Sequence, residues 1–412
     1  MARLAGAGEP LLTIEQAGAR AARLVSPVAE SRLIGLAEAD GRVLARPLDA
    51  PAALPRFANA AVDGYALRHA DLRRDAMTEL PVLGRVAAGQ PAAPLRQAGA
   101  IRIFTGAPVP EGADTLVMQE EVRREAERVL IPPGQRLGAH IRPAGEDIAI
   151  GARVLEAGHR LRPQDIGLLA ALGLTGIEVL RRPRVALFST GDELAEPGVA
   201  LGPASIHDAN RALLRAMLLR AGAEPVDLGI LRDDRASLSA RLAQAAGDCD
   251  LVLTSGGVSV GEEDHVKAVV AALGALDLWR IAIKPGKPVA VGRIGSTPFF
   301  GLPGNPVAVF VTFAFLARPL LARLAGAELH SPQRLPVRLG FGYRKQPGRR
   351  EFLRVSLEPA ADGGLIARRH PGFGAGSLVS LAQSDGLVEL VEELGEVEEG
   401  SVQPFLPYAG LS

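Results

Sequence analysis

A stretch from residue 183 to about residue 326 constrains the fold most, because short apolar segments alternate there with segments of helical length. Parallel strands need long crossover connections, usually helices, so this alternation predicts a doubly wound, mostly parallel sheet. The expected strands are 185–188, 225–230, 251–254, 278–283 and 298–301. The expected helices are 209–221, 236–246, 264–273 and 306–324, the first three ended by Gly222, Gly247 and Gly274.

The regions on either side of this stretch have a different pattern. Residues 55–142 show apolar alternation interrupted by Pro and Gly turns, and residues 327–412 form further short strands of this kind, so both predict small β domains. Near the start, Thr13 and Gln16 predict a capping box that opens a helix running toward Leu24. Because 412 residues exceed what one core usually supports, we expect a multidomain protein of α/β plus β class.

Composition excludes several classes of function. Basic and acidic side chains balance at 46 each, so no surplus charge attracts nucleic acid or a membrane surface. The longest apolar stretch, from Val307 to Leu321, is interrupted by Arg318 and Pro319 and is expected to be too short to span a bilayer. The single cysteine, Cys249, excludes an internal disulfide. The first ten residues lack the apolar region of a secretory signal, so the expected location is the cytoplasm.

Three polar loops that contain glycine each follow a predicted strand of the central region. In open parallel sheets, ligands bind beyond the carboxyl ends of the strands, so we expect these loops to converge on one crevice. The candidate binding residues are Thr190, Asp192 and Glu193 in the first loop, Ser255, Gly256, Gly257 and Ser259 in the second, and Pro303, Asn305 and Pro306 in the third.

The second loop has the chemistry of an anion-binding site. Adjacent glycines let backbone N–H groups approach a phosphate, and the hydroxyls of Ser255 and Ser259 add donors. Mg²⁺ prefers one or two carboxylates together with phosphate oxygens, so Glu193 and Asp264 are candidate ligands for that ion. The alternatives are an ordinary turn for the glycines and a helix-dipole partner for Asp264. In the third loop, helix capping alone would explain Asn305 and its neighbouring proline.

Lysine is rare among the 46 basic residues, occurring only as Lys267, Lys284, Lys287 and Lys345. Two of the four lie three residues apart in a Lys-Pro-Gly-Lys-Pro segment, which indicates a site that needs compact ammonium groups rather than guanidinium groups. The alternative is a pair of surface lysines on a Pro/Gly loop. A polyanionic substrate would require such fixed cations. Arg280 either joins them or is a half-exposed strand arginine.

Six motifs occur in order across roughly residues 10 to 390, and together they resemble the molybdopterin molybdenumtransferase family (MoeA), which includes the E domain of gephyrin. The motifs are Val62-Asp-Gly-Tyr-Ala66, Phe104-Thr-Gly-Ala-Pro-Val-Pro110, Ser189-Thr-Gly-Asp-Glu-Leu194, Ser255-Gly-Gly-Val-Ser-Val-Gly261, Lys284-Pro-Gly-Lys-Pro288 and Gly301-Leu-Pro-Gly-Asn-Pro-Val307. Two positions depart from the family pattern: Ala308 stands where relatives often have serine, and Arg280 where some have lysine.

The resemblance implies four subdomains and an elongated homodimer whose active site lies at the subunit interface. The subdomains would be a linker domain at 10–54 and 143–181, an inserted β-rich domain at 55–142, a doubly wound pterin-binding domain at 182–326 and a C-terminal β-barrel-like domain at 327–412. One subunit would contribute Asp63 and Thr105 to the site. The other would contribute Glu193, Asp264, Arg280, Lys284, Lys287, Pro303 and Pro306. A looser likeness suggests Arg350 and Ser380 as oxyanion ligands.

The reaction that the resemblance implies is insertion of molybdate into adenylylated molybdopterin with release of AMP. Mg²⁺ would be held by Glu193 and Asp264 and molybdate by the two lysines, and a pterin adenylyltransferase is a candidate partner. One alternative is that adenylyltransferase activity itself, although such enzymes are typically single small domains and roughly 180 residues precede Pro183 here. The other is a scaffold like gephyrin, which usually carries an additional domain.

Overall fold

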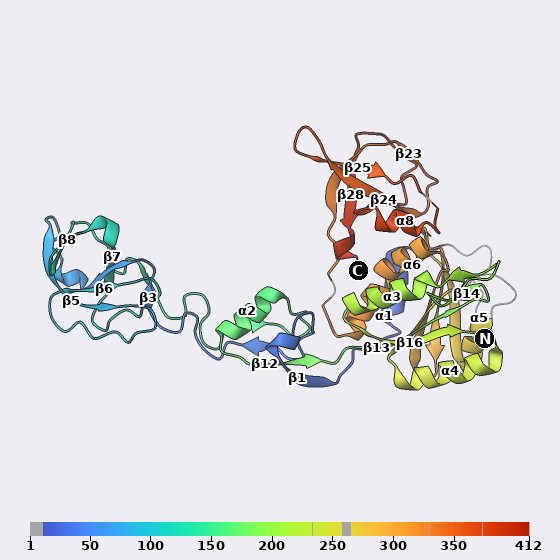
Figure 1. Cartoon of the computed structure of the whole chain (residues 1–412), viewed down its shortest axis with the longest axis horizontal. Helices are drawn as coiled ribbons and strands as arrows, with labels where there is room; N and C mark the ends of the chain where they lie inside the picture. Colours follow the sequence, from blue (N-terminus) through green and yellow to red (C-terminus); the bar gives the residue numbers. More distant parts are fainter. Residues whose placement is uncertain (1–10, 233, 258–264, 329, 373, 412) are drawn as a thin grey trace.

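The computed structural model describes residues 11–232, 234–257, 265–328, 330–372 and 374–411. The chain is elongated (Figure 1), with the sheet that contains β5 to β8 at one end and the central sheet and a β-barrel at the other. A narrow region that carries β1, β12 and α2 lies between them. The chain therefore has separate cores rather than one.

The central sheet has six strands in the order β16-β13-β17-β21-β20-β18. Neighbouring strands from β16 to β21 are parallel, whereas β20 is antiparallel to both β21 and β18. The predicted doubly wound, mostly parallel sheet is therefore confirmed. The strands are β13 (Arg184–Thr190), β16 (Glu224–Leu231), β17 (Leu251–Ser255), β18 (Gly274–Arg280), β20 (Pro288–Ile294) and β21 (Thr297–Leu302).

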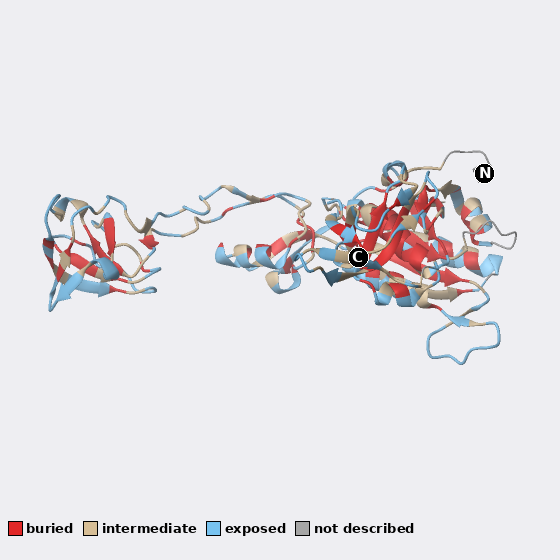
Figure 2. Ribbon diagram, turned by 90° about the horizontal axis from the view of Figure 1, so that it is seen from above, coloured by how far each residue is buried: buried red, intermediate tan, exposed pale blue. Residues whose placement is uncertain are grey.

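Helices cover both faces of this sheet because its strands are apolar on both sides. In β13, Val185 and Leu187 belong to the core shared with α3 and α6, whereas Ala186 and Phe188 belong to the core shared with α4 and α5. Alternate side chains of a strand point to opposite faces, so these cores are the two helix–sheet interfaces. Figure 2 shows the buried residues concentrated here. The helices are α3 (Ala209–Arg220), α4 (Arg235–Asp248), α5 (His265–Leu273) and α6 (Pro306–Thr312).

Several expectations for the central sheet are wrong in detail. The segment predicted as one strand at 278–283 is divided between β18 and β19 (Ile283–Lys284), and β20 was not predicted because it follows a Pro/Gly loop. Gly247 lies inside α4, whereas Gly274 directly follows the end of α5, as expected, and is also the first residue of β18. A Cβ on Gly274 would lie 2.2 Å from the carbonyl oxygen of Arg293, so close strand pairing excludes a side chain there. Gly222 likewise follows α3 with a φ of 82°, as expected.

Residues 306–324 form one helical segment made of α6, the π-helical turn η4 (Phe313–Ala317) and α7 (Arg318–Leu324). Its 19 residues and mean hydropathy of 1.8 are enough to cross a membrane, so excluding a span on length was wrong. The same segment is 78% buried within the protein, which is typical of the core helix of a globular domain.

The segments on either side of the inserted sheet combine into one unit. β1 (Ser31–Gly35) pairs antiparallel with β12 (Gly176–Leu180), and β2 (Leu48–Asp49) pairs with β11 (Arg153–Leu155). The helix α2 (Pro163–Ala171) contributes to the same core. Before this unit, α1 (Ile14–Ala22) begins with the predicted capping box and packs its buried face on the core of the central sheet.

The inserted sheet has six strands in the order β7-β4-β6-β5-β9-β8. It has two small cores, and most of its outward side chains are exposed. This confirms the β-rich character expected for this part of the chain. The strands are β4 (Gly64–Leu67), β5 (Thr78–Val86), β6 (Ala100–Ile103), β7 (Thr115–Met118), β8 (Arg123–Glu125) and β9 (Arg128–Ile131).

The C-terminal strands close into a barrel of five strands, because β24 pairs with β25 on one side and with β26 on the other. This confirms the predicted barrel-like architecture. The short strand β19 of the central region pairs in parallel with the start of β24, which joins the two parts of the protein. The barrel strands are β22 (Leu335–Leu339), β24 (Arg350–Pro359), β25 (Leu365–Arg369), β26 (Gly386–Leu390) and β28 (Val402–Pro407).

Candidate active site

The three polar loops of the central sheet meet at the carboxyl ends of β13, β17 and β21. The N–H of Gly256 donates to the carbonyl oxygen of Leu302 (3.2 Å), and the hydroxyl of Ser255 donates to that of Pro303 (3.4 Å). A Cβ on Gly256 would lie 3.1 Å from the carbonyl oxygen of Thr190, so the first loop touches the second. The predicted convergence of the loops is confirmed for the residues that the structure describes.

The two adjacent glycines of the second loop are required by its geometry. Gly256 and Gly257 have φ values of 87° and 65°, a region that residues with a Cβ rarely adopt. A Cβ on Gly257 would also lie 2.8 Å from side-chain carbons of both Thr190 and Val266. Residues 255–257, called the cradle below, therefore have backbone without a Cβ at two adjacent positions, and the N–H of Gly256 already donates to Leu302. Ser259 and Asp264 lie outside the described residues.

The first loop supplies two exposed carboxylates, Asp192 and Glu193. The Glu193 carboxylate folds back over Gly191, where an added Cβ would lie 2.5 Å from its Oε2. The Glu193 carbonyl oxygen accepts from the N–H of Ile206 at 2.7 Å, which fixes the backbone of this loop. The described residues contain no group of three or more His, Cys, Asp or Glu side chains placed to hold a metal ion. A cation here would rely on one or two carboxylates and on substrate oxygens.

The third loop joins the central sheet to the barrel. Asn305 is the N-cap residue of α6 and Pro306 is its first residue, as the sequence predicts, although the Asn305 side chain makes no capping hydrogen bond. The N–H of Val307 donates to the carbonyl oxygen of Ala375 at 3.0 Å. The barrel loop around residue 375 is therefore seated on the start of α6, next to Pro303 and the cradle.

Lys284 lies where the two parts of the protein are joined. Its Cα pairs with that of Glu351 in the β19–β24 ladder, and its ammonium lies 3.1 Å from both oxygens of that carboxylate. The hydroxyl of Tyr343 donates to Glu351 Oε2 at 2.8 Å, and burial together with this bond raises the pKa of Tyr343. Glu351 is only 1% exposed, whereas 48% of the Lys284 side chain remains accessible. Lys284 is thus held by the buried Glu351 carboxylate, while the rest of its side chain remains accessible to solvent.

A cavity of about 160 Å³ lies beside this group. Arg354 is 7% exposed and donates to the carbonyl oxygens of Gly372 (2.9 Å) and Gly374 (3.3 Å). Its Nε is buried and has no hydrogen-bond partner among the described residues, and burial lowers the pKa of this arginine. Such a donor favours an anionic ligand. The lining residues are Lys284, Pro285, Tyr343, Glu351, Phe352, Leu353, Arg354, Arg369, His370 and Ala375.

Two further candidates, Arg280 and Lys287, flank the lysine loop and are half-buried. The carbonyl oxygen of Lys287 accepts from the N–H of Ile281 at 2.8 Å, which closes the loop. The carbonyl oxygen of Arg280 accepts from the N–H of Leu12 at 2.9 Å. The backbone of this segment is therefore tied on both sides, which holds the Lys284 loop in place.

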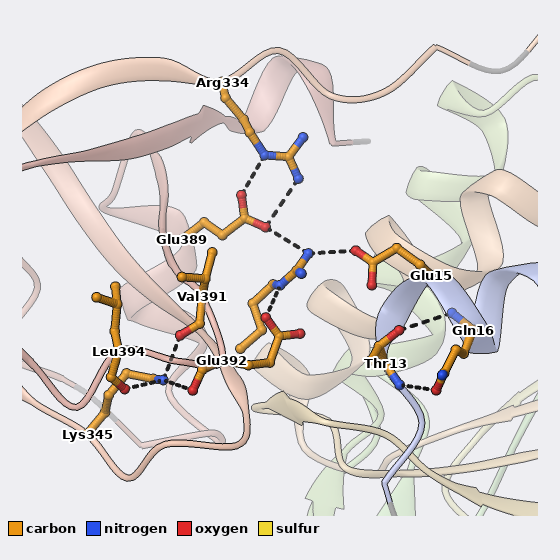
Figure 3. Close-up of polar contacts among 10 residues, drawn as sticks. Thr13, Glu15, Gln16, Arg334, Lys345, Glu389, Val391, Glu392 and Leu394 are labelled. Carbon is orange, nitrogen blue, oxygen red and sulfur yellow. Dashed lines mark hydrogen bonds and ion pairs between the residues drawn. The ribbon is translucent and has the colours of Figure 1, made fainter.

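Arg350 and Ser380 do not line this cavity. The Arg350 guanidinium binds Glu392 (3.0 Å), Glu15 (2.9 Å) and Glu389 (3.3 Å). Figure 3 shows these three carboxylates turned toward a common point between α1 and the barrel. Ser380 is fully buried and its hydroxyl donates to the carbonyl oxygen of Ser377 at 2.5 Å. The polar groups of both residues are thus engaged within the protein.

Asp63 and Thr105 form a pair on the inserted sheet. Asp63 Oδ1 accepts from the N–H and from the hydroxyl of Thr105, both at 2.8 Å, and these bonds lower the pKa of Asp63. Asp63 immediately precedes β4 and Thr105 follows β6, so the antiparallel pairing of those strands brings them together. Figure 1 places this sheet at the opposite end of the chain from β13 and from β14 (Leu194–Ala195), which lies in the first loop. Within one chain, this pair and the cradle therefore do not meet.

Three family profiles match the chain: the MoeA N-terminal region (domain I and II) at residues 12–173, a probable molybdopterin binding domain at 186–323 and the MoeA C-terminal region (domain IV) at 336–408. The molybdopterin molybdenumtransferase of Haemophilus influenzae is 37% identical over 402 residues, covering 96% of this chain and 99% of the relative. The chain belongs to the MoeA family.

Other members of the MoeA family support the same assignment. A molybdopterin molybdenumtransferase from Nostoc is 37% identical, covering 89% of this chain and 86% of the relative. The crystal structure of a molybdopterin biosynthesis MoeA protein from Pyrococcus horikoshii has a TM-score of 0.84 at 30% identity, and covers 97% of this chain and 100% of that one. The family resemblance and the multidomain architecture expected from the sequence are thereby confirmed.

In this MoeA chain, sequence reasoning missed the residues that surround Lys284 in the cavity. Arg354, Glu351 and Tyr343 were not candidates, although the Arg350-Glu-Phe-Leu-Arg354 segment places charges within an apolar strand. Buried charges of that kind usually have a partner or a ligand, which is the signal that could have identified them.

Proposed function

We propose that this MoeA-family protein is a molybdopterin molybdenumtransferase that inserts molybdate into adenylylated molybdopterin and releases AMP. One observation supports the proposal: the cradle and a cavity lined by Lys284, Arg354 and Arg369 lie next to each other. Ser255 of the cradle bonds to Pro303, and four residues later Val307 bonds to Ala375, which lines the cavity. A substrate with phosphates and a separate oxyanion needs such adjacent sites.

We assign molybdate to the cavity. Lys284, Arg354 and Arg369 supply three positive charges against the single carboxylate of Glu351. Charge-assisted bonds from these groups would hold a tetrahedral oxyanion, and the unsatisfied Nε of Arg354 would find its acceptor there. Lys287, three residues after Lys284, would add charge at the entrance.

We assign the phosphates of the substrate to the cradle at Gly257, with Thr190, Ser255 and Asn305 nearby, because the N–H of Gly256 already donates to Leu302. Asp192 and Glu193 at the same edge fit Mg²⁺, which needs only one or two carboxylates when phosphate oxygens complete its shell. Glu193 with Asp264 would hold this ion, whose chemistry is to neutralise the phosphate charge.

The residues themselves mainly supply position and charge. The cradle fixes the substrate so that its dithiolene sulfurs face the cavity, where the cations hold molybdate. As the two sulfurs bond to molybdenum, one oxygen of molybdate leaves as water with the two thiol protons, and no change of oxidation state is needed. Two reactants held in this way react as if in one molecule, which removes much of the entropic barrier. Hydrolysis of the phosphoanhydride bond then releases AMP.

We further propose that the working unit is a homodimer in which Asp63 and Thr105 of one subunit complete the site of the other. The support is their separation from the cradle within one chain (Figure 1), together with the fixed geometry of the exposed pair. A chain with Asp63→Asn and a chain with Lys284→Ala, each inactive alone, should recover up to half of the wild-type rate per dimer when co-purified as a heterodimer. No recovery in a verified heterodimer would contradict the shared site.

The function itself is tested by AMP release from adenylylated molybdopterin with and without molybdate. We expect release to depend on molybdate and to be lost in Lys284→Ala by about 100-fold, as for removal of a charged group that stabilises a transition state. Incubation with ATP and unmodified pterin is the control, and adenylylation there would instead indicate the preceding reaction. An Asp264→Asn variant with the full rate would remove the metal assignment.

A further inference from the structure

Two arginines and two aromatic rings gather at one end of the inserted sheet. Arg85 of β5 pairs with Arg102 of β6, and Arg102 pairs with Tyr65 of β4, so the three side chains are neighbours across the sheet. Phe104 follows β6, and the guanidinium carbons of Arg85 and Arg102 each lie 4.7 Å from the centre of its ring. This is a cationic cluster held together by an aromatic side chain.

The two arginines differ in what their N–H groups do. Arg102 donates to the carbonyl oxygen of Gly64 at 2.8 Å and to the side chain of Gln119, so it is engaged within the protein. Arg85 is exposed, and it donates no hydrogen bond to any residue in the part of the chain that the structure describes. Its face covers Phe104 while its N–H groups remain accessible to solvent. Stacking therefore orders Arg85 without using its donors.

The cluster lies beside the Asp63–Thr105 pair. Thr105 follows Phe104 directly, and Asp63 precedes Gly64, whose carbonyl oxygen holds Arg102. The N–H of Gln119 donates to the carbonyl oxygen of Asp63 at 3.0 Å, and the Gln119 amide also bonds to the exposed carboxylate of Glu120. Asp63 itself is bound by Thr105, whereas the N–H groups of Arg85 donate no hydrogen bond within the described part of the chain.

We infer that Arg85 is a substrate-binding residue that contacts a phosphate of the adenylylated pterin held on the partner subunit. This rests on the proposed function and on the shared site. A guanidinium matches phosphate oxygens with two parallel N–H bonds, and one already ordered by stacking loses less entropy on binding than a mobile one. Phe104 is then the positioning residue for Arg85.

The test compares Michaelis constants in the full-length protein. Arg85→Ala should raise the KM for adenylylated molybdopterin about tenfold, the usual worth of a charge-assisted bond, while the KM for molybdate stays unchanged. Arg85→Lys should give an intermediate KM because it keeps charge without the paired donors, and Phe104→Leu should raise the same KM by about threefold. The matched control is Arg124→Ala, an exposed arginine on β8 of the same sheet, which should behave as wild type.

The outcomes separate the two proposals. If the wild-type protein shows no molybdate-dependent release of AMP, the proposed function fails. If the wild type is active and Arg85→Ala and Arg85→Lys keep its KM for adenylylated molybdopterin, only the role of Arg85 is overturned. A variant whose two KM values rise together, or whose thermal midpoint falls, also overturns it, because that pattern indicates a structural role.

Discussion

Arg350 and Arg354 lie on the same strand, β24, yet their surroundings are opposite. Arg350 is bound by Glu15, Glu389 and Glu392, so positive charge is more than balanced there. Arg354 has backbone carbonyls as its only acceptors among the described residues, a buried Nε without a partner, and Lys284 across the cavity. The comparison teaches that a site for an anion is recognised by donors left unsatisfied, and a structural ion-pair network by charges already paired.

The largest expected effect is on the side of Arg354. Arg354→Ala removes a buried donor from the cavity, so we expect kcat/KM for molybdate in AMP release to fall by about 100-fold, which corresponds to about 2.7 kcal/mol. Arg368→Ala, an exposed arginine of β25 paired with Glu358, is the control and should stay within twofold of wild type. An Arg354→Ala variant that keeps the wild-type kcat/KM for molybdate would contradict the comparison.

Arg350 should matter for stability instead. Arg350→Ala leaves Glu15, Glu389 and Glu392 without their shared cation, and we expect urea unfolding to show a loss of about 3 kcal/mol. The KM for molybdate should remain within twofold of wild type, provided that the assay is run at a temperature where the variant is folded. If Arg350→Ala instead raised the KM for molybdate and left stability unchanged, Arg350 would be the anion-binding arginine, and the comparison would be wrong.

Glu351 sharpens the electrostatic side of the comparison. Glu351→Gln removes the only carboxylate of the cavity lining while keeping an oxygen that accepts from the Tyr343 hydroxyl. Because the lining gains net positive charge, the KM for molybdate should fall by about threefold, a modest Coulombic effect because the Lys284 side chain facing the anion is half-exposed to solvent. An increase in KM would mean that holding Lys284 in position outweighs the charge of the carboxylate.

The smallest expected effect is on stability at low pH, through Glu15, one of the three carboxylates bound by Arg350. Burial raises the pKa of Glu15, but its own backbone N–H, Thr13 and Arg350 lower it below 4.5 overall. A lowered pKa in the folded state stabilises the protein above the unfolded value, and this contribution is lost as the pH falls below about 4.5. The free energy of unfolding should therefore fall less between pH 5 and pH 3 in Glu15→Gln than in the wild type. The difference should be less than about 1 kcal/mol for such an exposed pair, measured by urea unfolding at each pH. An unchanged slope would show that Glu15 is not part of the network in solution.

Much of the fold could be predicted because it depends on local patterns. The alternation of apolar and helical segments predicts the parallel strands, and Thr13, Pro306 and Gly222 mark helix ends by their local chemistry. β20 was missed because it begins at Pro288, the last residue of Lys-Pro-Gly-Lys-Pro, whose prolines and glycine indicate a loop. The helix end before Gly274 was predicted, but its place at the start of β18 was not, because only the opposite strand reveals why this residue must be glycine.

The site was predicted where its residues follow strands of one sheet, as Thr190, Ser255 and Pro303 do. It was not predicted where a second domain contributes, because the β19–β24 pairing that brings Glu351 to Lys284 depends on tertiary contacts. The same reason explains why Arg350 was chosen over Arg354. Both are arginines in one strand, and only their neighbours distinguish them.

The most direct test of the cavity is anomalous X-ray scattering at the molybdenum edge from a crystal of this protein soaked in molybdate. We predict one strong peak per subunit in the cavity, placed so that the oxygens of molybdate accept hydrogen bonds from Lys284 and Arg354. Molybdenum density located only beside Arg350 and Arg334, or no density in the cavity when the anion saturates the enzyme in solution, would contradict the account.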